Sequence, residues 1–103
     1  MTTPQVTTRN GKSTLIPTAE MLATELSALP AGERTDLGSV RRKLAADHDV
    51  DQTCPVTTQR LLVEFSQGSD VPFWRVVDPE KPFAKRLVGG GERIREMLAA
   101  ERG

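Results

Sequence analysis

Apolar residues recur along this chain at the spacing of amphipathic helices, in four separate segments. The first segment follows Thr18, a good N-cap residue, and carries apolar residues at i, i+4 and i+7, namely Leu22, Leu26 and Leu29. Pro30–Gly32 should end this helix, because proline and glycine both interrupt it. The first helix is therefore predicted to be part of the core scaffold.

The second helix is predicted from about Asp36 to Ala46, behind a Thr35 cap. Its apolar stripe consists of Leu37, Val40 and Leu44. Arg41, Arg42 and Lys43 lie mainly off this stripe, where solvated side chains are the usual interpretation and phosphate contacts the less common one.

The third helix is predicted from about Pro55 to Phe65, since proline is favoured at the first helical position. Val56 and Leu62 should pack inward. The acidic link Asp47–Asp51 separates it from the second helix, and two helices joined so closely are typical of a helix-turn-helix. That pattern alone has low specificity, since many three-helix domains share it.

The remaining chain predicts a small wing and a fourth helix. Val71–Val77 should be extended, because Pro72 restricts its neighbour and two valines favour strands. Phe83–Val88 could pair back onto it. Gly89–Gly91 should allow a close backbone approach before a last helix, about Glu92–Glu101. The predicted fold class is mainly α, a winged helix-turn-helix domain with a small β wing.

The first twelve residues are Thr-rich and show no apolar periodicity, so 1–12 is predicted to be a disordered tail and 13–103 the single domain. Arg9 and Lys12 could touch a phosphate backbone, although any solvated tail could carry them. The length of 103 residues suits one core.

Charge and cysteine content narrow the functional classes. Lys plus Arg and Asp plus Glu both number 14, which argues against a strongly electrostatic nucleic-acid binder but leaves room for a compact footprint. A single cysteine forms no internal disulfide and suits the cytoplasm. No signal peptide or membrane segment is visible, so we expect a cytoplasmic monomer with no membrane partner.

Metal and cofactor chemistry is not indicated. His48 is the one histidine, and its acidic neighbours supply no second histidine or cysteine, so we expect an exposed loop residue and no metal site. The glycines at 89–91 lack the spacing of a dinucleotide loop, and no cofactor is expected.

Two motifs carry a family resemblance. The run Pro72-Phe73-Trp74-Arg75-Val76-Val77 and the later Gly-Gly-x-Glu-Arg resemble the active-site segment and last helix of the alkylguanine-DNA alkyltransferases. That family has Pro-Cys-His-Arg-Val at the first motif, and its cysteine accepts an alkyl group from damaged guanine. Phe73 stands at the cysteine position and Trp74 at the histidine position. The chain is thus more similar to the alkyltransferase-like group, which lacks the nucleophile; the resemblance spans roughly Leu29 to the C-terminus.

The resemblance implies a base pocket formed by Pro72, Phe73, Trp74, Arg75 and Glu96. Glu96 matches a glutamate that binds the family's histidine, so it could accept from the Trp74 indole or from Arg75. The implied DNA contacts are Thr57, Thr58, Gln59 and Arg60 on the third helix, with Lys85 and Arg86 on the wing.

The family's nucleotide-pushing tyrosine and base-replacing arginine are missing. Leu37 and Cys54 occupy those positions. Their absence favours a winged-helix protein-interaction or regulatory module that has lost base flipping. The aromatic pair favours a non-enzymatic DNA-binding protein that recognises alkylated guanine in double-stranded DNA, with a repair protein as a further partner.

Simple packing is an alternative to a functional role for three residues. Phe73 and Trp74 could simply pack in the core, an interpretation of nearly equal weight. Cys54, small and at a helix start, would usually be packed rather than reactive. An enzyme is the least favoured class, because no nucleophile–base pair is evident.

Overall fold

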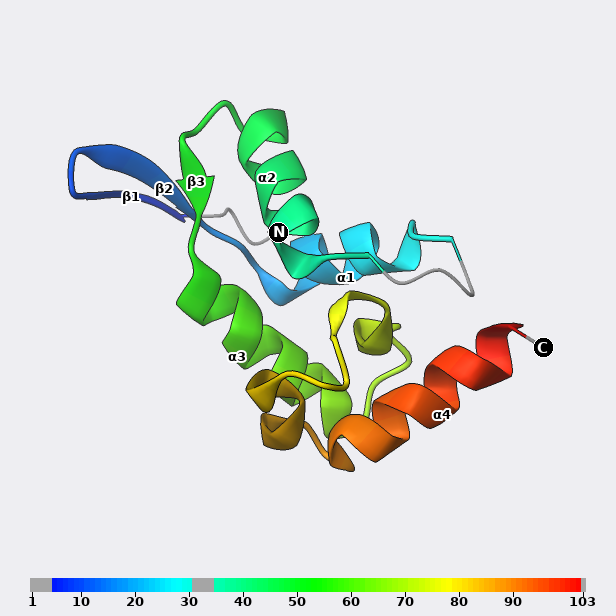
Figure 1. The fold of residues 1–103 in the computed structure, drawn as a ribbon. Helices are drawn as coiled ribbons and strands as arrows, with labels where there is room; N and C mark the ends of the chain where they lie inside the picture. The colour runs from blue at the N-terminus through cyan, green and yellow to red at the C-terminus, as the bar shows by residue number, and fades with distance from the viewer. Residues whose placement is uncertain (1–4, 31–34, 103) are drawn as a thin grey trace.

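The computed structural model describes residues 5–30 and 35–102. Helices dominate the described residues, as Figure 1 shows. The four α-helices are α1 (Ala19–Ser27), α2 (Leu37–Asp47), α3 (Pro55–Ser66) and α4 (Gly90–Arg102). The mainly α prediction is confirmed, and each predicted helix is present within a few residues of its expected bounds.

The N-terminal region differs from the predicted tail. Gln5–Arg9 (β1) and Lys12–Ile16 (β2) form an antiparallel hairpin, closed by Asn10 and Gly11 with φ of 52° and 78°. Asn-Gly with positive φ at both positions is the turn that matches strand twist. The disordered-tail prediction is therefore wrong for residues 5–12, while residues 1–4 lie outside the described part.

The hairpin joins the helices through one short parallel pair. Gln52–Thr53 (β3) lies beside β2, with Thr14 opposite Gln52 and Leu15 opposite Thr53, which gives the sheet order β1-β2-β3. Asp51 adds a reciprocal side-chain link, because its amide donates to Ser13 Oγ while Oδ2 accepts from Ser13. The hairpin is thus anchored to the segment that leads into α3 (Figure 1).

The predicted wing between the third and fourth helices is not formed. Two short 3-10 helices occupy this region, η1 (Phe73–Val76) and η2 (Pro82–Arg86), and residues 71–88 contain no strand. Strand propensity is overridden by packing, since η1 turns Phe73 and Val76 into the core and η2 does the same with Ala84.

One core joins these elements. Apolar residues that the sequence predicts to face inward meet in it: Leu22, Leu26, Leu44 and Leu62 are buried, and Leu37 packs against the same cluster from a partly buried position, as does Met97 of α4. The prediction that Val56 packs inward is wrong, because its side chain is 65% exposed on α3. Pro55 begins α3 with Cys54 as N-cap, so Val56 lies in the first turn, on the outer side.

Two local features set how the helices begin. Thr18 caps α1 as predicted, while α2 is capped by Asp36 rather than Thr35, through a bond from the Gly38 amide. At α4 the predicted close approach is confirmed: a Cβ added to Gly91 would lie 2.4 Å from the Pro79 carbonyl oxygen.

Candidate functional site

Phe73 is a core residue rather than the wall of an open pocket. Its side chain has no exposed surface, and the preceding Pro72 is also buried. The Arg93 guanidinium lies 5.3 Å from the ring centroid and covers one side. A base cannot stack on a ring that is enclosed by its own domain, so the base-pocket prediction is wrong for these two residues.

Trp74 and Arg75 both bind α4, but through Glu101 and not through Glu96, the predicted partner. The Trp74 indole donates to Glu101 Oε1 at 2.8 Å, and Arg75 Nε donates to the same oxygen at 3.0 Å. Arg75 also donates to the Leu29 carbonyl. Glu96 is exposed on α4, five residues earlier, so the predicted partner is replaced by Glu101.

The third helix offers fewer exposed polar groups than predicted. Thr58 is fully buried and donates to the backbone carbonyls of Pro55 and Cys54. Thr57 is 7% exposed and donates to Cys54 Sγ at 3.3 Å. Neither threonine is free to contact DNA, so these two assignments are wrong. Gln59 is half-buried and Arg60 is exposed, so both remain accessible.

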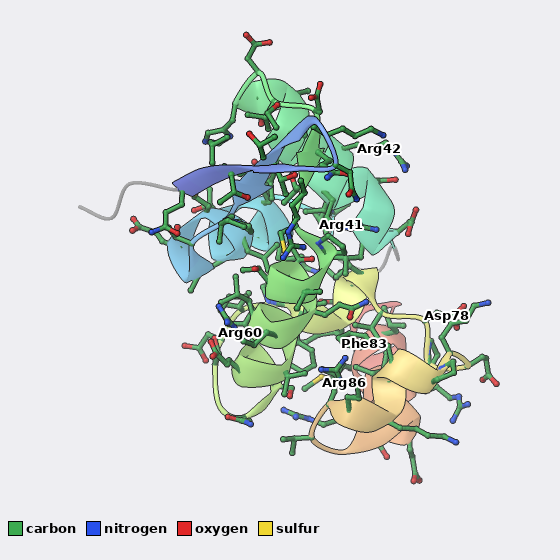
Figure 2. The ribbon with its side chains drawn as sticks, turned by 90° about the vertical axis from the view of Figure 1, so that its left-hand side faces the viewer. Arg41, Arg42, Arg60, Asp78, Phe83 and Arg86 are labelled. Carbon is green, nitrogen blue, oxygen red and sulfur yellow. The ribbon has the colours of Figure 1, made fainter. Side chains whose placement is uncertain are left out.

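Lys85 and Arg86 are exposed, as a phosphate contact needs, but they lie on η2 instead of a strand. The Arg86 guanidinium lies 5.4 Å from the centroid of the Phe83 ring. Figure 2 shows Arg86 and Phe83 together, to the right of Arg60 of α3, with Arg41 and Arg42 of α2 above. This view therefore displays cations from three elements.

An open hollow lies between the start of α2, α3 and the segment after η1. Its volume is about 390 Å³, within the range of small-ligand sites. Its lining includes apolar side chains, a half-buried aromatic ring and groups that can hydrogen-bond: Thr35, Asp36, Leu37, Gln59, Val76, Val77, Asp78, Lys81 and Phe83. We call it the Leu37–Phe83 hollow. Sequence reasoning missed it because it depends on how residues 76–83 fold back.

A second hollow of about 390 Å³ lies between α2 and β3. Arg41 and Arg42 line it from α2, and Asp51, Thr53 and Pro55 from the opposite side. Nε of Arg41 is shielded from solvent and has no hydrogen-bond partner in the described part of the chain. Buried donors are normally paired, so this one is poised for an anion or an ordered water.

Cys54 is buried at 2% exposure, lines neither hollow and has a perturbed thiol. Burial raises the pKa of the Cys54 thiol, but hydrogen bonds from the Thr57 hydroxyl and from the Thr57 and Val56 amides outweigh it, with Arg9 adding a small attraction. The net effect is a pKa below the ordinary value. The thiol is thus shielded from solvent, with a lowered pKa.

Comparisons with family models, curated proteins and solved structures returned no match. Within 5–30 and 35–102, no cluster of three histidine, cysteine or acidic side chains could hold a metal ion. In the same described residues, no helix combines the length and apolarity needed to cross a membrane. His48 is exposed after α2, as expected, with Nδ1 3.0 Å from the Leu44 carbonyl oxygen.

Proposed function

We propose that this protein binds double-stranded DNA without catalysing a reaction, and that it lodges a base in the Leu37–Phe83 hollow. The observation that carries the proposal is an open, partly apolar hollow beside the exposed residues of α3. Phe83 supplies the stacking surface that the resemblance assigns to Phe73. Stacking on an aromatic ring tolerates every base and contributes about 1–3 kcal/mol.

In this proposal α2 and α3 act as a helix-turn-helix. In it, α3 presents Gln59 and Arg60 to a groove, while Lys85 and Arg86 of η2 bind neighbouring phosphates. Neither Lys85 nor Arg86 lines the hollow, so both can bind phosphates while a base occupies the interior. The contacts would be sequence-tolerant, because phosphate binding carries no base information.

The positions of Phe73 and Cys54 argue against alkyl transfer. Phe73 places carbon where the family has sulfur, and it lies in the core. The one thiol, on Cys54, is buried outside both hollows. A thiolate needs access to the alkyl carbon and a group that accepts its proton. We therefore propose that an alkylated guanine is held rather than repaired, so that a repair protein can act on it.

A second candidate function rests on Val56. Its side chain is 65% exposed on α3, beside the residues assigned to DNA. An exposed apolar residue next to this surface is more typical of a protein interface than of a phosphate-binding one. The alternative is a protein-interaction or regulatory module that has lost base flipping.

The deciding experiment is a fluorescence-anisotropy titration with duplexes that carry guanine or O6-methylguanine at one position. We expect binding that weakens steeply with salt. Phe83→Ala should lower affinity about 5- to 150-fold, the equivalent of a lost stacking contact. Phe83→Leu is the matched control for apolar volume without a ring, and it should lose nearly as much if stacking is the cause.

Three outcomes would change the proposed function. Absence of duplex binding at 50 mM salt would contradict the DNA proposal and favour the protein-interaction module. Binding that is equal for wild type and Phe83→Ala would retain a DNA-binding protein but remove the base from this hollow. A methyl adduct on Cys54, detected by mass spectrometry, would overturn the non-enzymatic assignment.

A further inference from the structure

The β1–β2 hairpin has no packing role along its outer strand. Every residue of β1 is exposed, including Val6 at 54%. A two-stranded hairpin is marginally stable on its own, and this one is fixed to the domain through β2, by its short pairing with β3 and by the hydrogen bonds between Ser13 and Asp51. In Figure 1 the turn end projects beyond the helices. A projecting element with so little internal support suits a contact with something outside the chain.

The charges of the hairpin are all of one sign. Between Gln5 and Ile16 the charged residues are Arg9 and Lys12, and the strand register places them directly opposite each other next to the turn. Like charges in opposed positions repel and destabilise a hairpin. No carboxylate within residues 5–30 and 35–102 forms an ion pair with either of them. The tip thus concentrates positive charge that an anionic partner would neutralise.

The anchor of the hairpin fixes where that charge lies. The Cys54 amide donates to the Leu15 carbonyl at 2.8 Å, which continues the β2–β3 pairing into the first residue before α3. The hairpin therefore extends from the N-terminal end of α3. Figure 2, viewed from the side toward which the hairpin projects, also displays Arg41, Arg42 and Arg60. A duplex lying along α3 would meet the hairpin beyond the end of that helix.

We propose that the β1–β2 hairpin is a DNA-binding arm, in which Arg9 and Lys12 bind backbone phosphates of the duplex that α3 contacts. This inference rests on the proposed DNA-binding function and adds a second contact region to it. Five residues of strand extend about 17 Å, enough to reach past the end of α3. A two-stranded ribbon also fits the ~12 Å width of the major groove.

The test compares two double variants of the full chain. Arg9→Gln with Lys12→Gln removes the tip charges, while Lys43→Gln with Arg95→Gln removes the same net charge from exposed positions that pair with acidic residues elsewhere. We expect the hairpin variant to lower duplex affinity about tenfold or more at low salt and to reduce the salt slope by about 2, one per lost phosphate contact. The control variant should retain most of the duplex affinity and most of the salt slope.

The experiment can contradict the hairpin proposal without contradicting the base-binding proposal, and the reverse. If the hairpin and control variants bind equally, the arm is overturned, whatever Phe83→Ala does. If the hairpin variant loses affinity while Phe83→Ala does not, the result supports the DNA-binding arm and contradicts base binding in the Leu37–Phe83 hollow. Thr8→Glu, which adds a negative charge on β1, supplies a second variant and should weaken binding as well.

A second copy of the chain is the competing occupant, because β1 is an edge strand of the sheet that the described residues form, and an edge strand can pair with another chain. Sedimentation equilibrium of the wild type distinguishes the two. A dimer that the Arg9 and Lys12 substitutions leave intact, combined with unchanged DNA affinity, would overturn the arm and assign the hairpin to self-association. Circular dichroism of each variant verifies that the fold is retained.

Discussion

The Trp74 indole N–H and the Glu101 carboxylate are joined by a 2.8 Å hydrogen bond across 27 positions of the chain. The same carboxylate pairs with Arg75 Nη2 at 2.9 Å, and both charged side chains are largely enclosed, at 14% and 12% exposure. The last turn of α4 is thereby fixed to η1 by a charge-assisted cluster. The residues that the family resemblance assigns to chemistry serve here to hold a helix in place.

Glu101→Ala should therefore destabilise the fold by about 2–4 kcal/mol, because it leaves the Arg75 charge enclosed without its carboxylate. Trp74 emission should shift to the red as the indole is released to water. Urea unfolding and fluorescence measure both effects. Glu96→Ala is the matched control on the same helix and should change stability by less than about 0.5 kcal/mol. Equal effects of the two variants would contradict the cluster.

Phe73→Ala should cost about 3–5 kcal/mol of folding free energy, since it empties a fully enclosed site in the core. Phe73→Cys should also destabilise, and its thiol should react with a water-soluble disulfide reagent only on unfolding. Restoring sulfur at this position would not restore alkyl acceptance. A Phe73→Cys protein that reacts as fast as a free thiol while folded would show that the position faces an open pocket.

Thr57→Val should remove the stabilisation of the Cys54 thiolate. In the wild type the folded pKa is depressed, so folding stability should rise with pH from that pKa up to the ordinary value of 9.0. In Thr57→Val the side-chain donor is gone, and this rise should shrink. The stability difference between the two proteins should thus grow as the pH rises toward 9.0, as measured by urea unfolding. With Cys54→Ala in both backgrounds, the difference should be independent of pH.

Arg41→Gln should weaken duplex binding and reduce the salt slope by about 1, if a phosphate pairs with the orphaned Nε. Stability should be unchanged or slightly raised, because the substitution removes a shielded donor that has no partner among the described residues. Arg95→Gln, an exposed cation on α4, is the control. A large loss of stability with unaltered DNA affinity would assign Arg41 to the scaffold.

The helices could be predicted because their signals are local. Pro55 marks the start of α3, and the stripe of Leu22 and Leu26 marks the buried face of α1. The hairpin also had a local signal, since Asn10-Gly11 is a strong turn dipeptide, but the polar residues around it obscured the strand alternation. That signal could have identified β1 and β2.

The site could not be predicted in the same way. Phe73 and Val76 favour a strand by propensity, yet burial of both in one core requires the tighter turn of η1. The Leu37–Phe83 hollow combines residues more than 40 positions apart, which no local pattern specifies. Glu101 replaces Glu96 because the pairing depends on where α4 lies against η1, and alignment by motif does not give that position.

The parallel pairing of β2 with β3 has a consequence for the order of folding. The β1–β2 turn can close within microseconds, as hairpins do, but its docking waits until a 38-residue separation between Ser13 and Asp51 is bridged. Docking should therefore come late, and the hairpin should open before the helices do. Amide hydrogens of β1 should exchange with solvent first, and a protease should cut there while the remaining core is still closed.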